Sequence, residues 1–479
     1  MALAVIIVYL CALLFTSWYS TKKQKEASVE SFLYADKSLS TLLVGVTVAG
    51  LAVGGSSTTG VAQNAFKAGM SAGWYDTAWA AGALLMAFAF AGKLRESGLK
   101  TINGMWNQVF GTGFQNLSLV VQLATQLTIV ALQMVAGGTI LSALIPAISF
   151  KMGILLSAIV FIIIAYVGGM WSAALSNVVN VVVIYVGLIL GLIVAISHFG
   201  GLETINANLP AGVSGDGSHW YDLISGMGTA AITAWFLTML LQASPNSGLI
   251  QIALSSKDAK TARNGFILAA ILMIPAGFIS AMYGIIAAAF FPDLQNSAMA
   301  MATVTAQINP LIAGILLAGL WAADVSTATG LMVSLGTMIT NDLIVKFIKP
   351  DMDNSTQLKT SKIMILVCAI AAFIAANTVR SVLGTLMTVL TLWAPYTILM
   401  LGIFYFPQTI KKSSGWLVFA SGIVVFLLSQ FFMPSLAIMG QPIYTTTLVC
   451  LIVYAIVAVC DKNRAFEGDF VYNEALAKK

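Results

Sequence analysis

Two segments of the chain place small polar residues in a hydrophobic setting, and both could bind a cation. Residues 50–60 read GLAVGGSSTTG and residues 321–330 read WAADVSTATG. Both lie within long apolar runs. Because hydrocarbon offers no water to carbonyls, hydroxyls or a carboxylate, such groups at that depth must face the protein interior. The two segments therefore predict an ion site built mainly from backbone carbonyls and side-chain hydroxyls.

The second segment belongs to a small-polar stripe along one helix face. At about 100° per residue, the members of the stripe fall within an arc of roughly 100°. They are Ala323, Ser326, Thr327, Gly330, Ser334, Thr337 and Asn341. The alternative is that Ser and Thr bond back to the preceding turn and pack helices closely. The polar segment at 50–60 favours the ion site, because it supplies a partner for the stripe.

Asp324 and Asp76 are carboxylates deep in predicted spans, where each is costly unless paired, protonated or near an ion. On a regular helix Asp324 lies about 60° from Thr327 and about 140° from Thr329. We therefore expect Asp324 to face the solute pathway or the ion beside Thr327. A protonated Asp324 bonded to a neighbouring helix is the structural alternative.

The composition is that of a polytopic helical membrane protein. The chain has 479 residues, 59% hydrophobic and 9% charged, with a mean hydropathy of +0.93. A span needs about 20 apolar residues, and the sequence predicts about thirteen spans. They are 1–19, 41–63, 71–92, 114–146, 151–169, 172–197, 222–245, 265–291, 309–345, 361–379, 382–407, 415–434 and 441–460. The runs lack the alternation of a β-barrel.

The basic residues predict the orientation. Alternate loops carry about twenty Lys and Arg on one side and about three on the other, and cytoplasmic loops retain these residues. The three exceptions are Lys67, Lys151 and Arg380. We therefore expect a multi-pass protein of the plasma (inner) membrane, with the N-terminus outside and the C-terminus cytoplasmic. The net charge of +5 reflects this asymmetry and does not indicate nucleic-acid binding.

A single membrane transport domain over 1–479 is the simplest organisation. Glycines at 41–63 and the segment QASPNSG at 242–248 predict two broken helices five spans apart, as in inverted repeats. The predicted parts are an extra N-terminal helix at 1–19, five-helix repeats at 41–197 and 222–407, two C-terminal helices at 415–460 and a cytoplasmic tail at 461–479. Four scattered cysteines and two histidines form no catalytic or metal constellation, so we expect no enzyme and no organic cofactor.

Three further segments resemble the sodium:solute symporter family. They are FLYADKSL at 32–39, GLKTING at 98–104 and QIALSSKDAKTARNG at 251–265. The resemblance covers most of the chain. It implies an all-α leucine-transporter-type fold with an inverted 5+5 repeat, and symport of a solute with Na+.

The resemblance also implies a sodium site. In the family, carbonyls of the first core helix and a carbonyl and two hydroxyls of the eighth bind the ion. The matching residues here are Gly50, Val53, Ala323, Ser326 and Thr327. Many members hold a second sodium with an acid in the fifth core helix. The matching residue in WSAALSN at 171–177 is Asn177, so a second sodium is not expected, and Asp324, Asn177 and Thr329 are the candidates for other ion or proton coupling.

Four residues near the first broken helix and the following span are candidates for substrate binding. Gly54 and Ser57 belong to the first broken segment, and Asp76, with Trp79 beside it, matches an acidic substrate contact in the sugar-transporting branch. The alternative for Asp76 is capping of a helix that begins at Thr77.

Amides provide a second group of candidates. Gln122, Gln126 and Gln133 share one face of the third core helix, and amides both donate and accept hydrogen bonds. We expect Gln126 and Gln242 in the cavity and Gln133 in helix packing. The amides fit sugars, amino acids, carboxylates, nucleobases and vitamins alike.

The predicted function is import of a small polar organic solute, driven by inward movement of one Na+ per solute. The alternatives are a proton-coupled symporter that uses Asp324, or an uncoupled channel or facilitator. The expected partners are the solute, Na+ and the lipid bilayer, without nucleic acid or an obligate protein partner.

Overall fold

The computed structural model describes residues 8–9, 11–12, 15–16, 18–19, 29–99, 101–145, 147–211, 218–379 and 382–471. The regular elements in these ranges are helices. Two isolated β-bridges also occur there. Most of the helix predicted at 1–19, and the tail beyond residue 471, lie outside the described residues.

The first half of the chain forms nine described α-helices. They are α2 (Val29–Tyr34), α3 (Thr41–Ala52), α4 (Gly55–Ala68), α5 (Trp74–Leu85), α6 (Ala91–Glu96), α7 (Ile102–Phe110), α8 (Thr112–Leu144), α9 (Phe150–His198) and α10 (Gly201–Asn208). The second half contains α11 (Gly228–Ala243), α12 (Ser247–Ser255), α13 (Ala259–Phe290), α14 (Ala300–Gln307), α15 (Pro310–Met338), α16 (Asn354–Ala376), α17 (Val382–Thr391), α18 (Ala394–Tyr405), α19 (Ser414–Leu427) and α20 (Pro442–Cys460). The π-helical segment η6 (Ile339–Ile348) continues α15.

Eight helices among the described residues are long and apolar enough to cross a membrane, or up to nine if the bent pair α17 and α18 forms one span. The protein is therefore an integral multi-pass membrane protein. The predicted count of thirteen is not confirmed, because two of the predicted spans form shorter helices, Thr41–Ala52 and Gly228–Ala243. The backbone of α9 is helical throughout, so no loop separates the spans predicted at 151–169 and 172–197.

The chain breaks between α3 and α4, within the glycine-rich segment. Val53 has φ −89° and ψ 82°, and Gly54 has φ −118° and ψ −179°, so neither residue continues the helix. The Ser57 hydroxyl accepts a hydrogen bond from the Gly54 N–H and donates one to the Gly54 carbonyl, each at 3.0 Å. These bonds satisfy backbone groups that the break would otherwise leave unpaired in the membrane interior.

A second break separates α11 from α12 at Ser244, Pro245 and Asn246. Pro245 has no N–H to donate to a continuing helix. Asn246 Oδ1 caps α12 by accepting from the N–H groups of Gly248 and Leu249 at 3.0 and 3.3 Å. The two breaks lie where the sequence predicts them. The arrangement of the other helices as inverted repeats stays a prediction.

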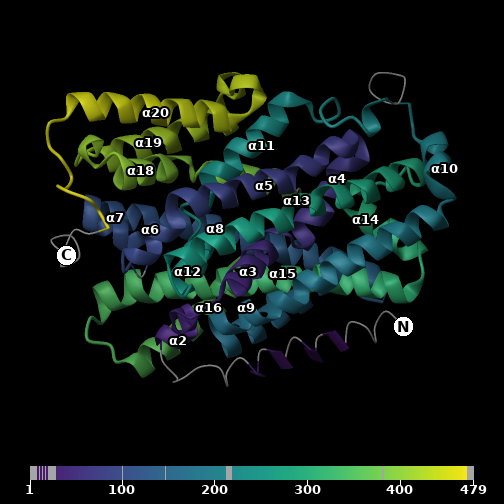
Figure 1. The fold of residues 1–479 in the computed structure, drawn as a ribbon, viewed down its shortest axis with the longest axis horizontal. Coiled ribbons are helices and arrows are strands. Elements are labelled where there is room, and N and C mark those ends of the chain that lie inside the picture. The colour runs from purple at the N-terminus through teal and green to yellow at the C-terminus, as the bar shows by residue number, and fades with distance from the viewer. Residues whose placement is uncertain are drawn as a thin grey trace.

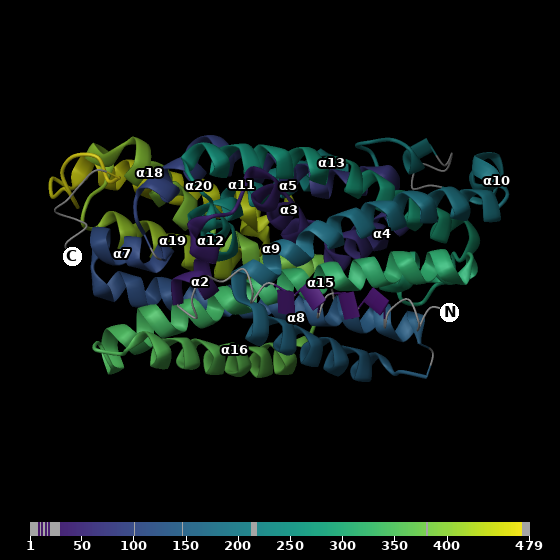
Figure 2. The same cartoon turned by 60° about the horizontal axis from the view of Figure 1, so that its bottom comes forward.

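The helices pack side by side in an elongated bundle, with α7 at one end and α10 at the other (Figures 1 and 2). Helix α13 packs against α3, α4 and α5, and α15 packs against α8 and α9. In the most apolar window of Pro310–Ile348, 83% of residues are buried, against 28% in Asn354–Ala376. Helix α15 is therefore central, whereas α16 presents much of its surface outward.

Close packing of α13 on α4 requires glycine at position 284. A Cβ atom added there would lie 2.4 Å from the Ala62 carbonyl oxygen. Gly284→Ala should push the helices apart at a cost of about 1–3 kcal/mol and lower the Tm of the purified protein by several degrees. The control is Gly330→Ala, where an added Cβ meets nothing within 4 Å. Equal Tm values for the two variants would contradict this packing.

Candidate functional site

The break of α3 lies directly against α15. Because α3 stops at Ala52, the carbonyls of its last turn lose their normal helical partners. The Thr327 hydroxyl supplies a donor, with its Oγ1 3.0 Å from the Gly50 carbonyl oxygen and 3.3 Å from the Leu51 carbonyl oxygen. One hydroxyl of α15 therefore contacts two carbonyls of the broken helix, both deep within the protein.

The other predicted sodium ligands lie at the same junction. Ser326 is buried, and its Oγ donates to the Ala323 carbonyl at 2.9 Å. The carbonyl carbon of Ala323 lies 3.8 Å from the position of a Cβ added to Gly54, the residue after Val53. The back-bond of Ser326 is the one expected for simple helix packing, but the oxygen lone pairs stay available to a cation. The structure thus brings the two predicted halves of the site together.

Asp324 lies against the start of α4. Its Oδ2 is 2.3 Å from the position of a Cβ added to Gly55, and its Oδ1 is 3.4 Å from that of Gly54. Only glycine leaves room for the carboxylate at position 55. A helix N-terminus carries partial positive charge, which favours an acidic group there. Asp324 is fully buried.

The other two coupling candidates occupy different places. Asn177 of α9 packs on the first break, with its Oδ1 2.3 Å from the position of a Cβ added to Gly50. The neighbouring Asn180 Nδ2 donates to the Ala322 carbonyl at 3.2 Å. The Asn177 amide therefore lies against the end of α3. Thr329 is buried, and its hydroxyl has no hydrogen-bond partner among the described residues.

A small cavity of about 30 Å³ adjoins the ion-site residues. It is lined by Leu51, Ala52, Ser57, Tyr75, Trp79, Ile129, Gln133, Gln242, Asn246, Thr327, Leu331, Leu386 and Leu390. Ser57, Trp79 and Gln242 were predicted here. This volume is well below the roughly 300–1,000 Å³ that small-molecule sites commonly occupy.

Gln126 and Gln133 lie in the opposite places from those expected, since Gln133 lines the cavity and Gln126 does not. Gln126 is not among the described residues that line the cavity; it accepts from Ser247 Oγ at 2.8 Å and donates to Gln122 Oε1 at 3.2 Å. Gln122 in turn donates to the Pro245 carbonyl at 3.1 Å, so this pair supports the second break. Gln133 lines the cavity, and its Oε1 has no partner among the described residues. The two glutamines are seven residues apart on one face, so helical spacing could not tell which lies at cavity depth.

Asp76 lies between α5 and α13, apart from the cavity. Its Cβ is 3.2 Å from the position of a Cβ added to Gly277 of α13. Helix α5 begins at Trp74, so Asp76 does not occupy the capping position considered from the sequence. The neighbouring Tyr75 and Trp79 face the cavity, with Trp79 Nε1 donating to the Tyr75 hydroxyl at 3.1 Å. Sequence reasoning missed Tyr75 as a lining residue, although it lies one turn before Trp79.

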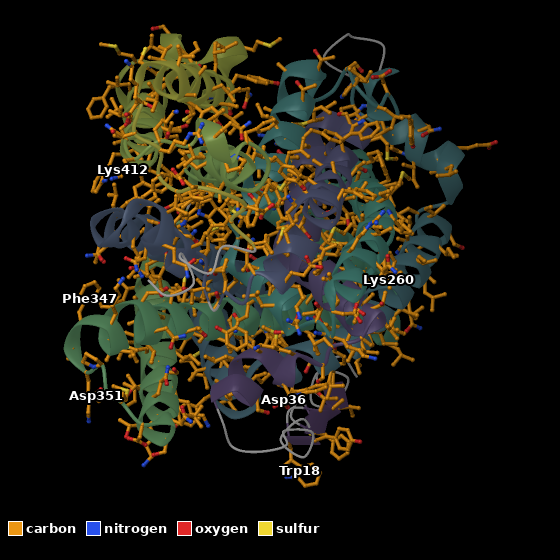
Figure 3. All side chains as sticks on the ribbon, turned by 60° about the vertical axis from the view of Figure 1, so that its left-hand side comes forward. Trp18, Asp36, Lys260, Phe347, Asp351 and Lys412 are labelled. Carbon is orange, nitrogen blue, oxygen red and sulfur yellow. The ribbon has the colours of Figure 1, made fainter. Side chains whose placement is uncertain are left out.

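Wider openings lie beyond the small cavity. One, of about 440 Å³, is lined by residues of α4, α11 and α17, three helices that also line the small cavity, and Lys67 is its charged member among the described residues. Another, of about 450 Å³, is lined by Thr101, Asp342 and Lys346 with neighbouring polar residues. Figure 3 labels Phe347 and Asp351 next to this region, with Lys412 on the α18–α19 connection above them.

Several known proteins are similar to this chain. The profile of the sodium:solute symporter family matches residues 32–411. The sodium/glucose cotransporter of Vibrio parahaemolyticus is 22% identical over 91% of this chain and 86% of its own length. The sodium/pantothenate symporter of Escherichia coli is 24% identical over 78% of each chain. A solved Na+-coupled sialic acid symporter, in a substrate-bound outward-open state, has a TM-score of 0.78 at 17% identity, covering 97% of this chain and 98% of its own. This last likeness shows a leucine-transporter-type fold.

The glycine beside Asp324 should be essential to cation binding. Gly55→Ala should displace the carboxylate and the start of α4, because the new Cβ would lie 2.3 Å from Asp324 Oδ2. We expect the Na+ concentration that half-maximally raises Tm, at constant ionic strength with K+, to increase about tenfold or more, equivalent to about 1.4 kcal/mol. Gly60→Ala, whose nearest neighbour would be 3.7 Å away, is the matched control. Unchanged Na+ dependence in Gly55→Ala would contradict this geometry.

Proposed function

Because the chain belongs to the sodium:solute symporter family, we propose that it imports a small polar organic solute together with Na+ by alternating access. Proteins of this family are transporters and not enzymes. The observation that carries the proposal is the hydrogen bond from Thr327 of α15 to the Gly50 carbonyl at the end of α3.

We assign the coupling site to Gly50, Val53, Ala323, Ser326 and Thr327. Na+ would draw on the Gly50 carbonyl and the Thr327 hydroxyl at once, since the hydroxyl can turn its hydrogen away and offer a lone pair. The ion would then join α15 to the end of α3 and to the start of the break. Neutral oxygen ligands suit a coupled ion, because it must also leave in each cycle.

In this arrangement, two residues of the proposed sodium junction also line the proposed solute cavity. Leu51 and Thr327 meet at the sodium junction and also line the cavity. Na+ that orders the end of α3 would therefore shape one side of the solute site, which supports coupling over uncoupled flow. An inside-negative potential supplies about 2.3 kcal/mol per charge per 100 mV in addition to the Na+ gradient.

The proposed solute is polar but has some apolar surface. The described lining residues of the cavity offer hydroxyl and amide groups from Ser57, Gln133, Gln242 and Asn246, beside leucines and aromatic rings. None of these lining residues carries a formal charge. This supports a neutral or zwitterionic solute, and the relatives named for glucose and pantothenate are consistent with a small organic molecule.

The basic residues support a cytoplasmic position for the cavity that contains Lys346, with the Lys67 cavity outside. Import would then proceed from the Lys67 side to the Lys346 side. We propose a position in the plasma membrane, with the C-terminus in the cytoplasm.

Removal of the Thr327 hydroxyl is the direct test. Thr327→Ala should raise the Na+ concentration for half-maximal uptake into proteoliposomes about tenfold or more, because the Gly50 junction loses an oxygen. The solute is first chosen by Na+-dependent thermal shift against sugars, amino acids, carboxylates, nucleobases and vitamins. Thr139→Ala is the control, since its buried hydroxyl donates to the Val135 carbonyl within α8.

Two results would contradict the sodium assignment. One is unchanged Na+ dependence in Thr327→Ala. The other is wild-type uptake driven by a pH gradient without Na+ and lost in Asp324→Asn, which would select the proton-coupled alternative. Solute flux with no response to either gradient would indicate a facilitator.

A further inference from the structure

The contact between Thr327 and the Gly50 carbonyl is the midplane junction. Asp342 is a second buried carboxylate of the α15 segment, at the far end from this junction. It lies in η6 with 5% of its surface exposed. Its Oδ1 accepts a hydrogen bond from Thr101 Oγ1 at 2.9 Å. Its Oδ2 has no hydrogen-bond partner among the described residues. A buried carboxylate oxygen without a donor is costly, and a cation relieves that cost.

The surroundings of Asp342 can accommodate an ion. It lines the cavity of about 450 Å³, together with the oxygen-bearing side chains of Thr101, Gln115 and Asn341. This volume is ample for a partly hydrated cation, since a cavity of about 10–15 Å³ already holds one water molecule. A carboxylate, a hydroxyl and amide oxygens together form a set of hard ligands suited to Na+.

A row of polar side chains extends along one helix face from Asp342 toward the midplane junction. Thr327, Ser334 and Thr337 belong to one face of α15, and Asn341 continues that face beside Asp342. Ser334, Thr337 and Thr101 also line a small cavity of about 20 Å³. Along a helix, the 15 residues from Thr327 to Asp342 span roughly 22 Å, about the distance from the bilayer centre to its surface region.

Lys346 is the other charged residue, among the described residues, that lines the 450 Å³ cavity. It stands four positions after Asp342, and its Nζ donates to Gln115 Oε1 of α8. Opposite charges at this spacing on a helix attract each other. The Lys346 ammonium is therefore a tethered cation that can compete for the Asp342 carboxylate.

We propose that Asp342 forms a second Na+ site at the inner end of the pathway, which receives the ion after it leaves the Thr327 junction. Lys346 then displaces the ion toward the cytoplasm and hinders its return. This inference rests on the proposed function for the order of the two sites. The Asp342 site itself depends only on its own residues.

Equilibrium binding of ²²Na+ to the purified full-length protein tests the site. Thr327→Ala should weaken one class of bound Na+ about tenfold or more and leave a second class unchanged, and addition of Asp342→Asn should abolish that second class. Asn keeps an oxygen that can accept from Thr101. In the Thr327→Ala background, Lys346→Gln should lower the Na+ concentration for half-saturation about tenfold or more, because the tethered competitor is gone. The control is Lys349→Gln, an exposed residue just after η6.

Residual binding that is indifferent to both Asp342→Asn and Lys346→Gln would overturn the inner site. Should Asp342→Asn fail to fold, Lys346→Gln alone decides, since tighter Na+ binding supports the site and unchanged binding refutes it. Loss of all bound Na+ in Thr327→Ala would also refute it. By contrast, unchanged total binding in Thr327→Ala, with a component still lost on Asp342→Asn, would refute the midplane site and retain the inner one.

Discussion

The interrupted hydrogen bonding of α3 is the constraint on which the rest of the site depends. A helix that stops within a membrane leaves carbonyl oxygens without donors, and each costs several kcal/mol in an apolar setting. At Gly50 and Leu51, Thr327 of α15 provides that donor from another helix. The junction that we propose as the ion site is therefore a consequence of breaking this helix in contact with α15.

The surrounding polar residues support the two helix breaks. Ser57 satisfies both backbone groups of Gly54, and Gly55 leaves room for the Asp324 carboxylate at the start of α4. At the second break, Asn246 caps α12, and Gln122 bonds the Pro245 carbonyl. Each interruption thus has its own polar partners, which keep unwound backbone stable between packed helices. The cavity lies between the two interruptions, where both supply lining residues.

The sequence predicts features that depend on composition and periodicity better than those that depend on depth. Glycines and Pro245 located both breaks, and the stripe containing Thr327 located the face of α15 that meets the first break. Spacing alone placed Gln126 and Gln133 on one face, but their depth relative to the break decided that Gln133 lines the cavity. Asp76 faces α13, because the neighbouring helix and not its own periodicity determines what it touches. The span count is not confirmed, because some helices next to the breaks fall below membrane length.

Replacement of Na+ by Tl+ in crystals of the wild-type protein would test the midplane junction most directly, because the anomalous signal locates the cation. We predict a peak within coordination distance of the Gly50 carbonyl and the Thr327 hydroxyl, with that hydroxyl no longer donating to the carbonyl. Bound Tl+ elsewhere, with the Thr327 to Gly50 hydrogen bond intact, would contradict a cation site at this junction.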